Sequence, residues 1–234
     1  MVKRTATIVL LLLAFSLAAL ADGITLTGTG NNSAGGVYVV PYYLTVQSGT
    51  NSTTYTVACD SYFNDVSVGQ SWTGTVNTWA TLGQTKFGSA SSSTFNAAQA
   101  YTEAAWLFNQ YLASPSSTTA AATNFAIWSL FLPAYQTPLN STDLANLLSG
   151  LNSTGAEAWV SAANAWYSSA TPTQLSLYQS NLLIFTPTGS TNDGNGPQEY
   201  VASVVPVPEP ASVLLFGTGL LFGFGFLKRK LSVC

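Results

Sequence analysis

The protein has 234 residues, of which six are Lys or Arg, nine are Asp or Glu and none is His. Only 6% of the residues are charged, whereas about a quarter of the residues are charged in an ordinary soluble domain. This composition excludes a nucleic-acid partner, because affinity for phosphates comes largely from Lys and Arg. It also excludes imidazole metal sites and every catalytic arrangement that needs a histidine.

Residues 1–21 have the features of a secretory signal peptide. A basic start precedes an apolar run over residues 7–20, and residues 19–21 (Ala-Leu-Ala) fit the small-x-small rule for cleavage. The run is short for a bilayer span and a cleavage site follows it, which favours a cleaved signal over a retained anchor. The sequence therefore predicts that the body, residues 22–204, is exported.

The body is expected to form one α+β domain, with a β-rich N-terminal part, a helical middle and a C-terminal β-hairpin. Residues 24–80 hold several runs of β-branched and aromatic residues separated by turn residues. Residues 81–93 are rich in Gly, Ser and Thr and are expected to form a loop. Strand patterns return at residues 182–186 and 199–204, which we expect to pair as a hairpin.

Hydrophobic periodicity and helix-ending residues predict four helices in the middle of the body. They cover residues 95–113, 120–132, 141–150 and 156–168, with Gly150 closing the third. We expect Thr118 or Thr119 to cap the second helix, and Ser153 or Thr154 with Glu157 to cap the fourth. The second helix is apolar nearly all round, so it should be the buried central helix.

A second apolar segment, residues 211–227, follows a proline-rich stem at residues 205–210. Its seventeen residues reach about 25 Å as a helix, which is the short end of what spans a bilayer. The tail, residues 228–234, should stay cytoplasmic because basic residues flank transmembrane helices on that side. These basic residues are Lys228, Arg229 and Lys230. Composition alone also fits a plain C-terminal membrane tail.

Pro208, Glu209 and Pro210, followed by a glycine-containing apolar segment and a Lys/Arg cluster, resemble the PEP-CTERM sorting signal of bacterial surface proteins. The resemblance covers about residues 206–230. It implies that exosortase, a membrane-embedded transpeptidase-like enzyme, recognises the Pro-Glu-Pro motif while the helix holds it at the membrane. It further implies a final location at the cell surface or in the extracellular matrix, associated with polysaccharide.

Cys59 and Cys234 are the only cysteines, and the predicted membrane segment separates them. A disulfide within the body is therefore excluded, although the compartment would permit one. Cys59 is expected to be either a buried small hydrophobe or a reactive thiol, and base rates favour burial.

Residues 55–60 (YTVACD) and 122–128 (ATNFAIW) resemble the bacterial surface thioester domain. In that family a strand Cys joins a Gln side chain, and the resulting thioester attaches covalently to host surfaces. The resemblance implies that Cys59 and Asn124 form the reactive pair. Asn124 stands where the family has Gln, which puts the thioester in doubt and leaves the topology as the firmer implication.

Between residues 22 and 205, Lys86 is the only basic side chain, against eight acidic ones. Capture of anionic ligands is thereby disfavoured, whereas neutral sugars, which stack on Trp and Tyr, suit such a body. The alternative is that these aromatic residues form the core. The six tryptophans are Trp72, Trp79, Trp106, Trp128, Trp159 and Trp166.

Two pairs of acidic residues are candidates for a chemical site. Asp60 and Asp65, which flank Asn64, could bind Ca²⁺ or serve as turn residues. Glu103 and Glu157 could form the carboxylate pair of a glycoside hydrolase, or serve as helix caps and solvated side chains. In both cases the second interpretation is preferred, so we predict no metal, no cofactor and no catalytic residue in this chain.

The sequence thus predicts an exported bacterial surface protein that exosortase processes, with a non-catalytic structural or polysaccharide-associated body. The expected partners are exosortase, the membrane and neutral extracellular polysaccharide. The alternative is a covalent surface adhesin of the thioester type that uses Cys59.

Overall fold

The computed structural model describes residues 21–92, 94–135, 139–189 and 196–203. The predicted signal peptide up to residue 20, the stem, the membrane helix, the PEP motif and the basic tail lie outside the described residues. Among the helices that are described, none is both long enough and apolar enough to cross a membrane.

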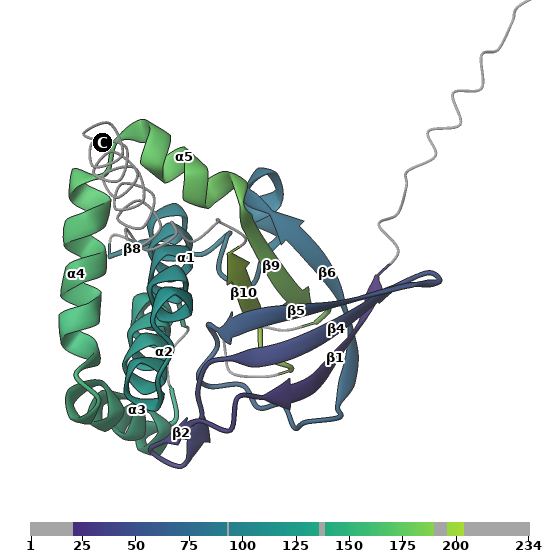
Figure 1. Ribbon diagram of the computed structural model, residues 1–234, viewed down its shortest axis with the longest axis horizontal. Helices are drawn as coiled ribbons and strands as arrows, with labels where there is room; N and C mark the ends of the chain where they lie inside the picture. The colour runs from purple at the N-terminus through teal and green to yellow at the C-terminus, as the bar shows by residue number, and fades with distance from the viewer. Residues whose placement is uncertain (1–20, 93, 136–138, 190–195, 204–234) are drawn as a thin grey trace, which may run out of the picture.

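Six strands of the body close into an antiparallel barrel in the order β1-β4-β5-β10-β9-β6 (Figure 1). The strands are β1 (Asp22–Thr29), β4 (Tyr42–Ser48), β5 (Asn51–Cys59), β6 (Ser71–Thr78), β9 (Leu182–Pro187) and β10 (Tyr200–Ser203). Side chains alternate along β4, where Tyr42, Leu44 and Val46 are buried and Tyr43 is exposed. This period of two directs the apolar residues into the barrel and the polar residues to its outer face.

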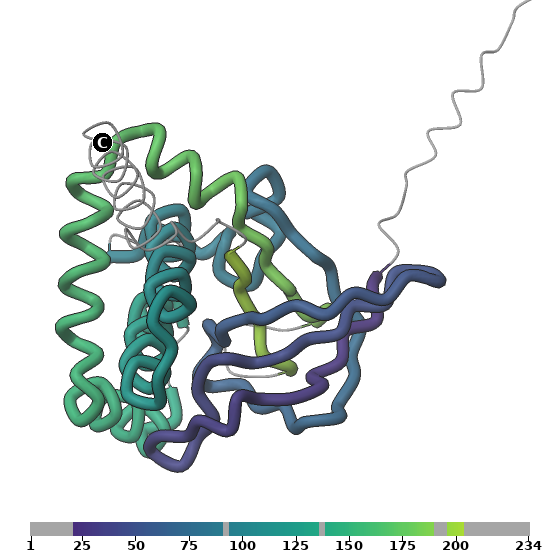
Figure 2. The backbone as a smooth tube through the Cα atoms, in the orientation of Figure 1, coloured from purple at the N-terminus to yellow at the C-terminus, as the bar shows by residue number. Residues whose placement is uncertain are grey.

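The predicted C-terminal hairpin is confirmed, and it completes the barrel. β9 and β10 pair with each other in antiparallel register, with Tyr200 opposite Phe185. β9 also pairs with β6, and β10 pairs with β5, where Tyr200 lies opposite Cys59. Figure 2 shows the chain returning from the helices to the strands at this point. The last strand of the body therefore lies beside a strand that ends 141 residues earlier, since Tyr200 pairs with Cys59.

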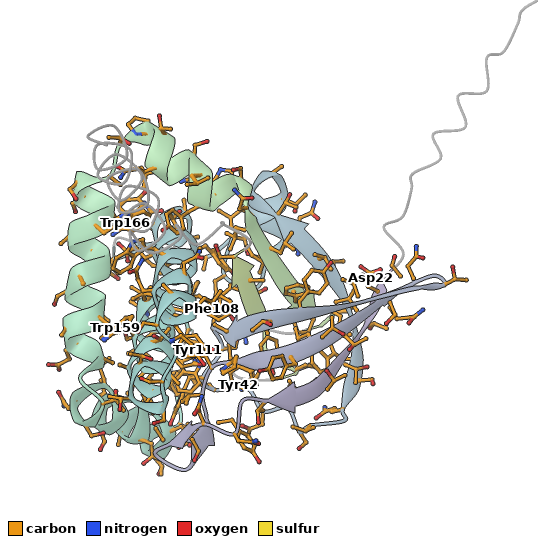
Figure 3. The ribbon with its side chains drawn as sticks, viewed as in Figure 1. Asp22, Tyr42, Phe108, Tyr111, Trp159 and Trp166 are labelled. Atoms are coloured by element: carbon orange, nitrogen blue, oxygen red, sulfur yellow. The ribbon has the colours of Figure 1, made fainter. Side chains whose placement is uncertain are left out.

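The helical middle is also confirmed, and its helices gather on one side of the barrel (Figure 1). They are α1 (Ala97–Ala113), α2 (Ser117–Phe131), α3 (Ser141–Ser153), α4 (Ala156–Ser169) and α5 (Pro172–Ser180). α2 packs against α1, α3 and α4 and also contacts β5, as expected for a buried central helix. Phe108 and Tyr111 of α1 and Tyr42 of β4 lie between the helices and the barrel (Figure 3). The barrel and the helices therefore share one hydrophobic core.

Two predicted helix caps are wrong in detail. α2 is capped by Ser116, whose hydroxyl accepts from the backbone N–H of Thr119, while the Thr119 hydroxyl accepts from the Ser116 N–H. The cap of α4 is Gly155 in the left-handed conformation (φ 74°), with no side-chain cap. A glycine adopts that conformation without the steric cost of a Cβ, so no capping hydroxyl is needed.

Gly150 does not close the third helix, contrary to our expectation, because α3 continues to Ser153. Gly150 is buried inside the helix, and a Cβ built on it would overlap the ring of Phe125. The glycine therefore permits close packing of α3 on α2, and is not a stop signal.

Several short elements were not predicted. A 3₁₀-helix (Trp79–Gln84) occupies the start of the segment expected to be a loop, and α5 connects α4 to β9. Two further small hairpins pair β2 (Ser33–Ala34) with β3 (Val37–Tyr38), and β7 (Ser91–Ser92) with β8 (Phe95–Asn96). A short 3₁₀-helix (Leu132–Ala134) follows α2.

Candidate functional site

Cys59 lies at the end of β5, where the barrel meets α2, and its side chain is fully buried. Its Sγ accepts a hydrogen bond from Trp128 Nε1 at 3.4 Å and another from the Ser61 N–H at 3.4 Å. The sulfur also donates to the Ser61 carbonyl oxygen at 3.6 Å. The prediction that Cys59 is buried is thereby confirmed, and the thiol sits among defined polar partners.

The structure brings Asn124 to Cys59, as the thioester resemblance implied, but through the backbone. Asn124 Nδ2 donates to the Cys59 carbonyl oxygen at 3.0 Å, and the Val40 N–H donates to Asn124 Oδ1 at 2.9 Å. Asn124 itself is fully buried. Its amide therefore links the end of β5 to the chain before β4, and such double satisfaction is what a buried amide needs for stability.

The Cys59 thiol is held in its protonated form. Burial raises its pKa to about 12, and the adjacent Asp60 carboxyl group adds to the rise, while the hydrogen bond from Trp128 opposes it. Because the thiolate is the nucleophilic form, this environment suppresses the spontaneous reactivity of the sulfur.

Next to Cys59, two carboxyl groups are buried together. Asp60 and Glu199 are both fully buried, and the Asp60 N–H donates to the Glu199 carbonyl oxygen at 3.3 Å. Glu199 accepts from Tyr101 Oη at 2.5 Å, from Thr186 Oγ1 at 2.5 Å and from the Lys86 N–H at 2.8 Å. Three donors are an environment that suits an ionised carboxylate.

Asp60 has a different environment. Its Oδ1 accepts from Ser61 Oγ at 3.0 Å, and its carboxyl group shares a hydrogen bond with that of Glu199. Burial, followed by the negative charge of Glu199, raises the pKa of Asp60 well above its usual value, while Lys86 lowers it. Burial also raises the pKa of Glu199, whereas its hydrogen-bond donors oppose the rise, so Glu199 is the better placed of the two groups to carry a charge.

Lys86, the single base of the body, is buried in the same place and is only 6% exposed. Its Nζ contacts Asn64 Oδ1 and lies 5.3 Å from the centre of the Phe87 ring and 5.4 Å from that of Tyr135. The sequence shows Lys86 as the only basic side chain of the body but does not place it in the fold. A lysine is rarely buried unless it has partners, so the burial of Lys86 depends on partners that the sequence alone does not identify.

The structure does not bring the candidate calcium ligands Asp60, Asn64 and Asp65 together. Asp60 is buried and Asp65 is exposed, while Asn64 contacts Lys86. Within the described ranges, no group of three or more Cys, Asp or Glu residues is arranged to hold a metal ion.

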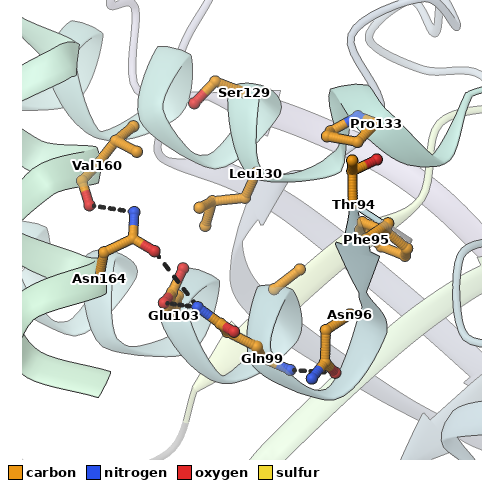
Figure 4. A pocket seen from close by; sticks show the side chains of 11 residues that line it. Thr94, Phe95, Asn96, Gln99, Glu103, Ser129, Leu130, Pro133, Val160 and Asn164 are labelled. Carbon is orange, nitrogen blue, oxygen red and sulfur yellow. Dashed lines mark hydrogen bonds between the residues drawn. The ribbon is translucent and has the colours of Figure 1, made fainter. Parts of the chain in front are cut away.

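The carboxylates weighed for glycoside hydrolysis lie in different settings. Glu103 on α1 lines a pocket of about 560 Å³ between α1, α2 and α4, whereas Glu157 is exposed and does not line it (Figure 4). Gln99 Nε2 donates to Glu103 Oε1 at 2.8 Å and to Asn164 Oδ1 at 3.3 Å. Burial raises the pKa of Glu103, and the bond from Gln99 opposes it. The pocket therefore offers one carboxyl group, not a pair.

None of the six tryptophans is exposed. Trp128 is buried and the others are half-buried. Trp166 of α4 stacks on Trp106 of α1 with ring centres 5.4 Å apart, and Trp159 lies on the same outer helix (Figure 3). The core interpretation of these aromatic residues is thus the better one, and the exposed aromatic side chains include Tyr38 and Tyr43.

The outer surface of the barrel carries a continuous set of hydroxyl groups, which we call the hydroxyl face. It spans β6, β1, β4 and β5, and its members oppose one another in the register, as Thr45 opposes both Thr25 and Thr54. The Thr25 and Ser71 hydroxyls lie 2.7 Å apart, and those of Thr45 and Thr54 lie 3.2 Å apart. The face consists of Thr25, Thr27, Tyr43, Thr45, Thr54, Thr56, Ser71 and Thr73.

Comparison with known proteins bears on the C-terminal region. The PEP-CTERM protein-sorting motif matches residues 206–230. The chain carries a PEP-CTERM sorting signal. This motif marks an exported protein with a membrane-associated C-terminal signal that exosortase processes. Such a protein is located at the cell surface after processing. No curated protein and no solved structure matches the chain.

Proposed function

We propose that this protein is a surface module of the extracellular polysaccharide layer, delivered by its PEP-CTERM signal, and that its body contacts neutral polysaccharide without catalysing a reaction. The sorting motif at residues 206–230 is the observation that carries the delivery step. Because the catalytic residues of sorting belong to exosortase, Pro208, Glu209 and Pro210 act as a recognition sequence. Residues 211–227 anchor the chain until it is processed.

The hydroxyl face supports the contact with neutral sugars. Hydroxyl groups donate and accept hydrogen bonds as sugar hydroxyls do, and Tyr43, 36% exposed, offers a ring for stacking. The body has one lysine, which is buried, so no cation on its described surface selects an anionic polymer. A surface of hydroxyl groups without charged side chains suits many weak contacts along a polymer.

The sorting step is tested on protein recovered from cells. The native chain is expected to lose residues 211–234, whereas the variant Pro208→Ala/Glu209→Ala/Pro210→Ala keeps them and stays in the membrane fraction. Intact mass spectrometry measures both outcomes, and Ser232→Ala in the tail is the matched control, which should be processed normally. A native chain that still carries residues 211–234 at the surface would contradict the proposal.

The sugar contact is tested with Tyr43→Ala in the full-length protein. Retention on an immobilised neutral polysaccharide should fall about fivefold or more, because an aromatic contact contributes about 1 kcal/mol. Tyr38→Ala is the control, since Tyr38 is 54% exposed and lies outside the hydroxyl face. Equal retention of all three proteins, or retention of none, would refute the assignment of this face.

A second candidate is the covalent adhesin. It is favoured by one observation, namely that the chain brings Cys59 and Asn124 into contact although they lie 65 positions apart. A thioester would form as Sγ bonds to Asn124 Cγ and the amide nitrogen leaves as ammonia. The mature protein would then be lighter by one ammonia, and Cys59→Ala would abolish the deficit. A deficit that persists in Cys59→Ala, or none at all, would exclude the thioester.

A further inference from the structure

We propose that Lys86 and Asn64 are joined by a side-chain amide bond, which the body forms by itself from the lysine amine and the asparagine carboxamide. This inference concerns the buried polar cluster that follows Cys59, namely Asp60, Asn64, Lys86 and Glu199, and it is independent of the proposed function. It assigns a covalent modification to two residues of the barrel end, with ammonia as the only other product.

The first support is the juxtaposition of the reacting groups. Lys86 Nζ contacts Asn64 Oδ1, and the two side chains are 6% and 1% exposed. Asn64 Nδ2 donates to the Gly196 carbonyl oxygen at 2.9 Å, which turns the amide oxygen toward the lysine and the amide nitrogen toward an exposed residue. The amine therefore lies beside Cγ, and the leaving nitrogen faces away from the lysine. Holding two reactants in this way replaces an encounter in solution.

The second support is the exclusion of water. The amine lies near the rings of Phe87 and Tyr135, with centres 5.3 Å and 5.4 Å away, and both residues are buried. A buried charge is costly unless it is paired, and an amide bond between the same atoms carries no charge. Forming the bond thus removes an ammonium group from the interior. Hydrolysis is also hindered, because water does not reach the linked atoms.

The third support is a pair of buried carboxyl groups, Asp60 and Glu199, that can accept and donate a proton. Glu199 has its oxygens engaged by Tyr101, Thr186 and the backbone of Lys86, which keeps it in place as an ionised group. Asp60 is fully buried beside Glu199, the two carboxyl side chains share a hydrogen bond, and the charge of Lys86 acts on Asp60. A pair of carboxyl groups held together in this way can pass a proton between the amine and the leaving nitrogen.

The reaction balances within this set of groups. The ammonium of Lys86 first gives one proton to the Asp60–Glu199 pair. The neutral amine then forms a C–N bond to Asn64 Cγ, and the Cγ–Nδ2 bond breaks. The proton lost by the attacking nitrogen passes through the pair to the departing nitrogen, which leaves as ammonia. The first proton stays on the carboxyl pair, so no oxidant or further reactant is required.

The experiment is a peptide map of the full-length protein recovered from cells. A protease digest should contain one branched peptide in which the segment around residue 64 is joined to that around residue 86, lighter than the sum by one ammonia. The branched peptide should survive hydroxylamine, which cleaves a thioester, and should persist in Cys59→Ala. Separate and unmodified peptides would overturn the proposal, as would a bond from Lys86 to Asp60 or Glu199, which would release water.

Four variants sharpen the result. Lys86→Met and Asn64→Ala should lose the branched peptide completely. Asn64→Asp should still form it, now with loss of water, and give a product identical in mass to the native one. Asp60→Ala should slow its formation on the order of 100-fold, the usual contribution of a positioned acid or base.

Asn109→Ala is the matched control, because Asn109 is also a buried asparagine, and its amide donates to the Ser203 hydroxyl at the end of β10. This variant should keep the branched peptide. If Asp60→Ala is misfolded, Asn64→Asp still tests the proposal. A covalent bond would give the branched peptide in that variant, whereas an ion pair between residues 64 and 86 would leave the two peptides separate. An unlinked Asn64→Asp that folds normally would contradict the proposal.

Discussion

At the scale of single residues, Asp60 and Glu199 show how neighbouring groups of the same type acquire different protonation. Both carboxyl groups are fully buried, which alone favours the neutral form of each. Three hydrogen-bond donors reach Glu199, whereas Ser61 is the side-chain donor to Asp60. The second negative charge is therefore avoided at Asp60, and the two carboxyl groups together carry at most one negative charge.

This arrangement predicts that the stability of the native body falls as pH rises above about 4, the ordinary pKa of an unfolded Asp. The folded state binds the Asp60 proton more tightly than the unfolded state does, because the folded-state pKa is raised. Each pH unit within the window then costs up to about 1.4 kcal/mol of unfolding free energy. Denaturant unfolding of the detergent-solubilised full chain from pH 4.5 to 8 measures this slope.

Asp60→Asn is the informative variant for that slope. The carboxamide resembles the protonated acid in shape and charge, so the dependence on pH should be weaker than in the native chain. Some pH dependence of stability should remain in this variant, since the pKa of Glu199 is also raised, chiefly by burial. Asp65→Asn, at an exposed position, should leave the slope unchanged. A native chain whose stability rises over this range would show that Asp60 is ionised when folded.

At the scale of elements, the packing of α3 on α2 depends on Gly150. Gly150→Ala would place a Cβ on the ring of Phe125, which is fully buried. Overpacking costs about 1–3 kcal/mol, and the better helix propensity of Ala returns up to about 1 kcal/mol. We expect a net loss of about 1–2 kcal/mol in the free energy of unfolding.

Gly83→Ala provides the comparison, because nothing lies within 4 Å of a Cβ built there. This substitution should change stability by less than about 0.5 kcal/mol. Both variants can be compared with the native chain by chemical denaturation. Equal effects of the two substitutions would mean that α3 shifts away from α2 at little cost.

The elements themselves were largely predictable, because their signals are local. The apolar stretch around Phe125 identified the central helix, and the run of β-branched and aromatic residues at Tyr42–Val46 identified a strand. Gly150 was misread since a glycine that ends a helix and one that permits close packing look alike in sequence. The partner that distinguishes them, Phe125, lies 25 residues away.

At the scale of the whole molecule, the closed barrel and the buried centre could not be predicted from the sequence. Local patterns identify β5, β9 and β10 but do not say that β10 lies between the other two. Only this pairing brings Glu199 to Lys86 and Asp60, which are far apart along the chain. The solitary Lys86 was visible in the composition, but its partners depend on the topology.

The same topology predicts where the body can be cut. β10 closes the barrel and is preceded by Glu199, whose side chain joins Tyr101 of α1, Thr186 of β9 and the backbone of Lys86. A body of residues 22–198 would lose the closing strand and leave buried donors without a partner. It should therefore fail to fold, whereas residues 22–204 should fold.

Circular dichroism and limited proteolysis of the two truncated bodies test this expectation. The longer one should melt cooperatively and resist protease, and the shorter one should do neither. Val201→Ala within residues 22–204 is the matched control, because it trims a fully buried side chain in β10 but keeps the strand and Glu199. It should fold with about 1–3 kcal/mol less stability. A shorter body as resistant as the longer one would mean that the barrel does not need β10, and that removal of the C-terminal signal could extend into the strand without harm.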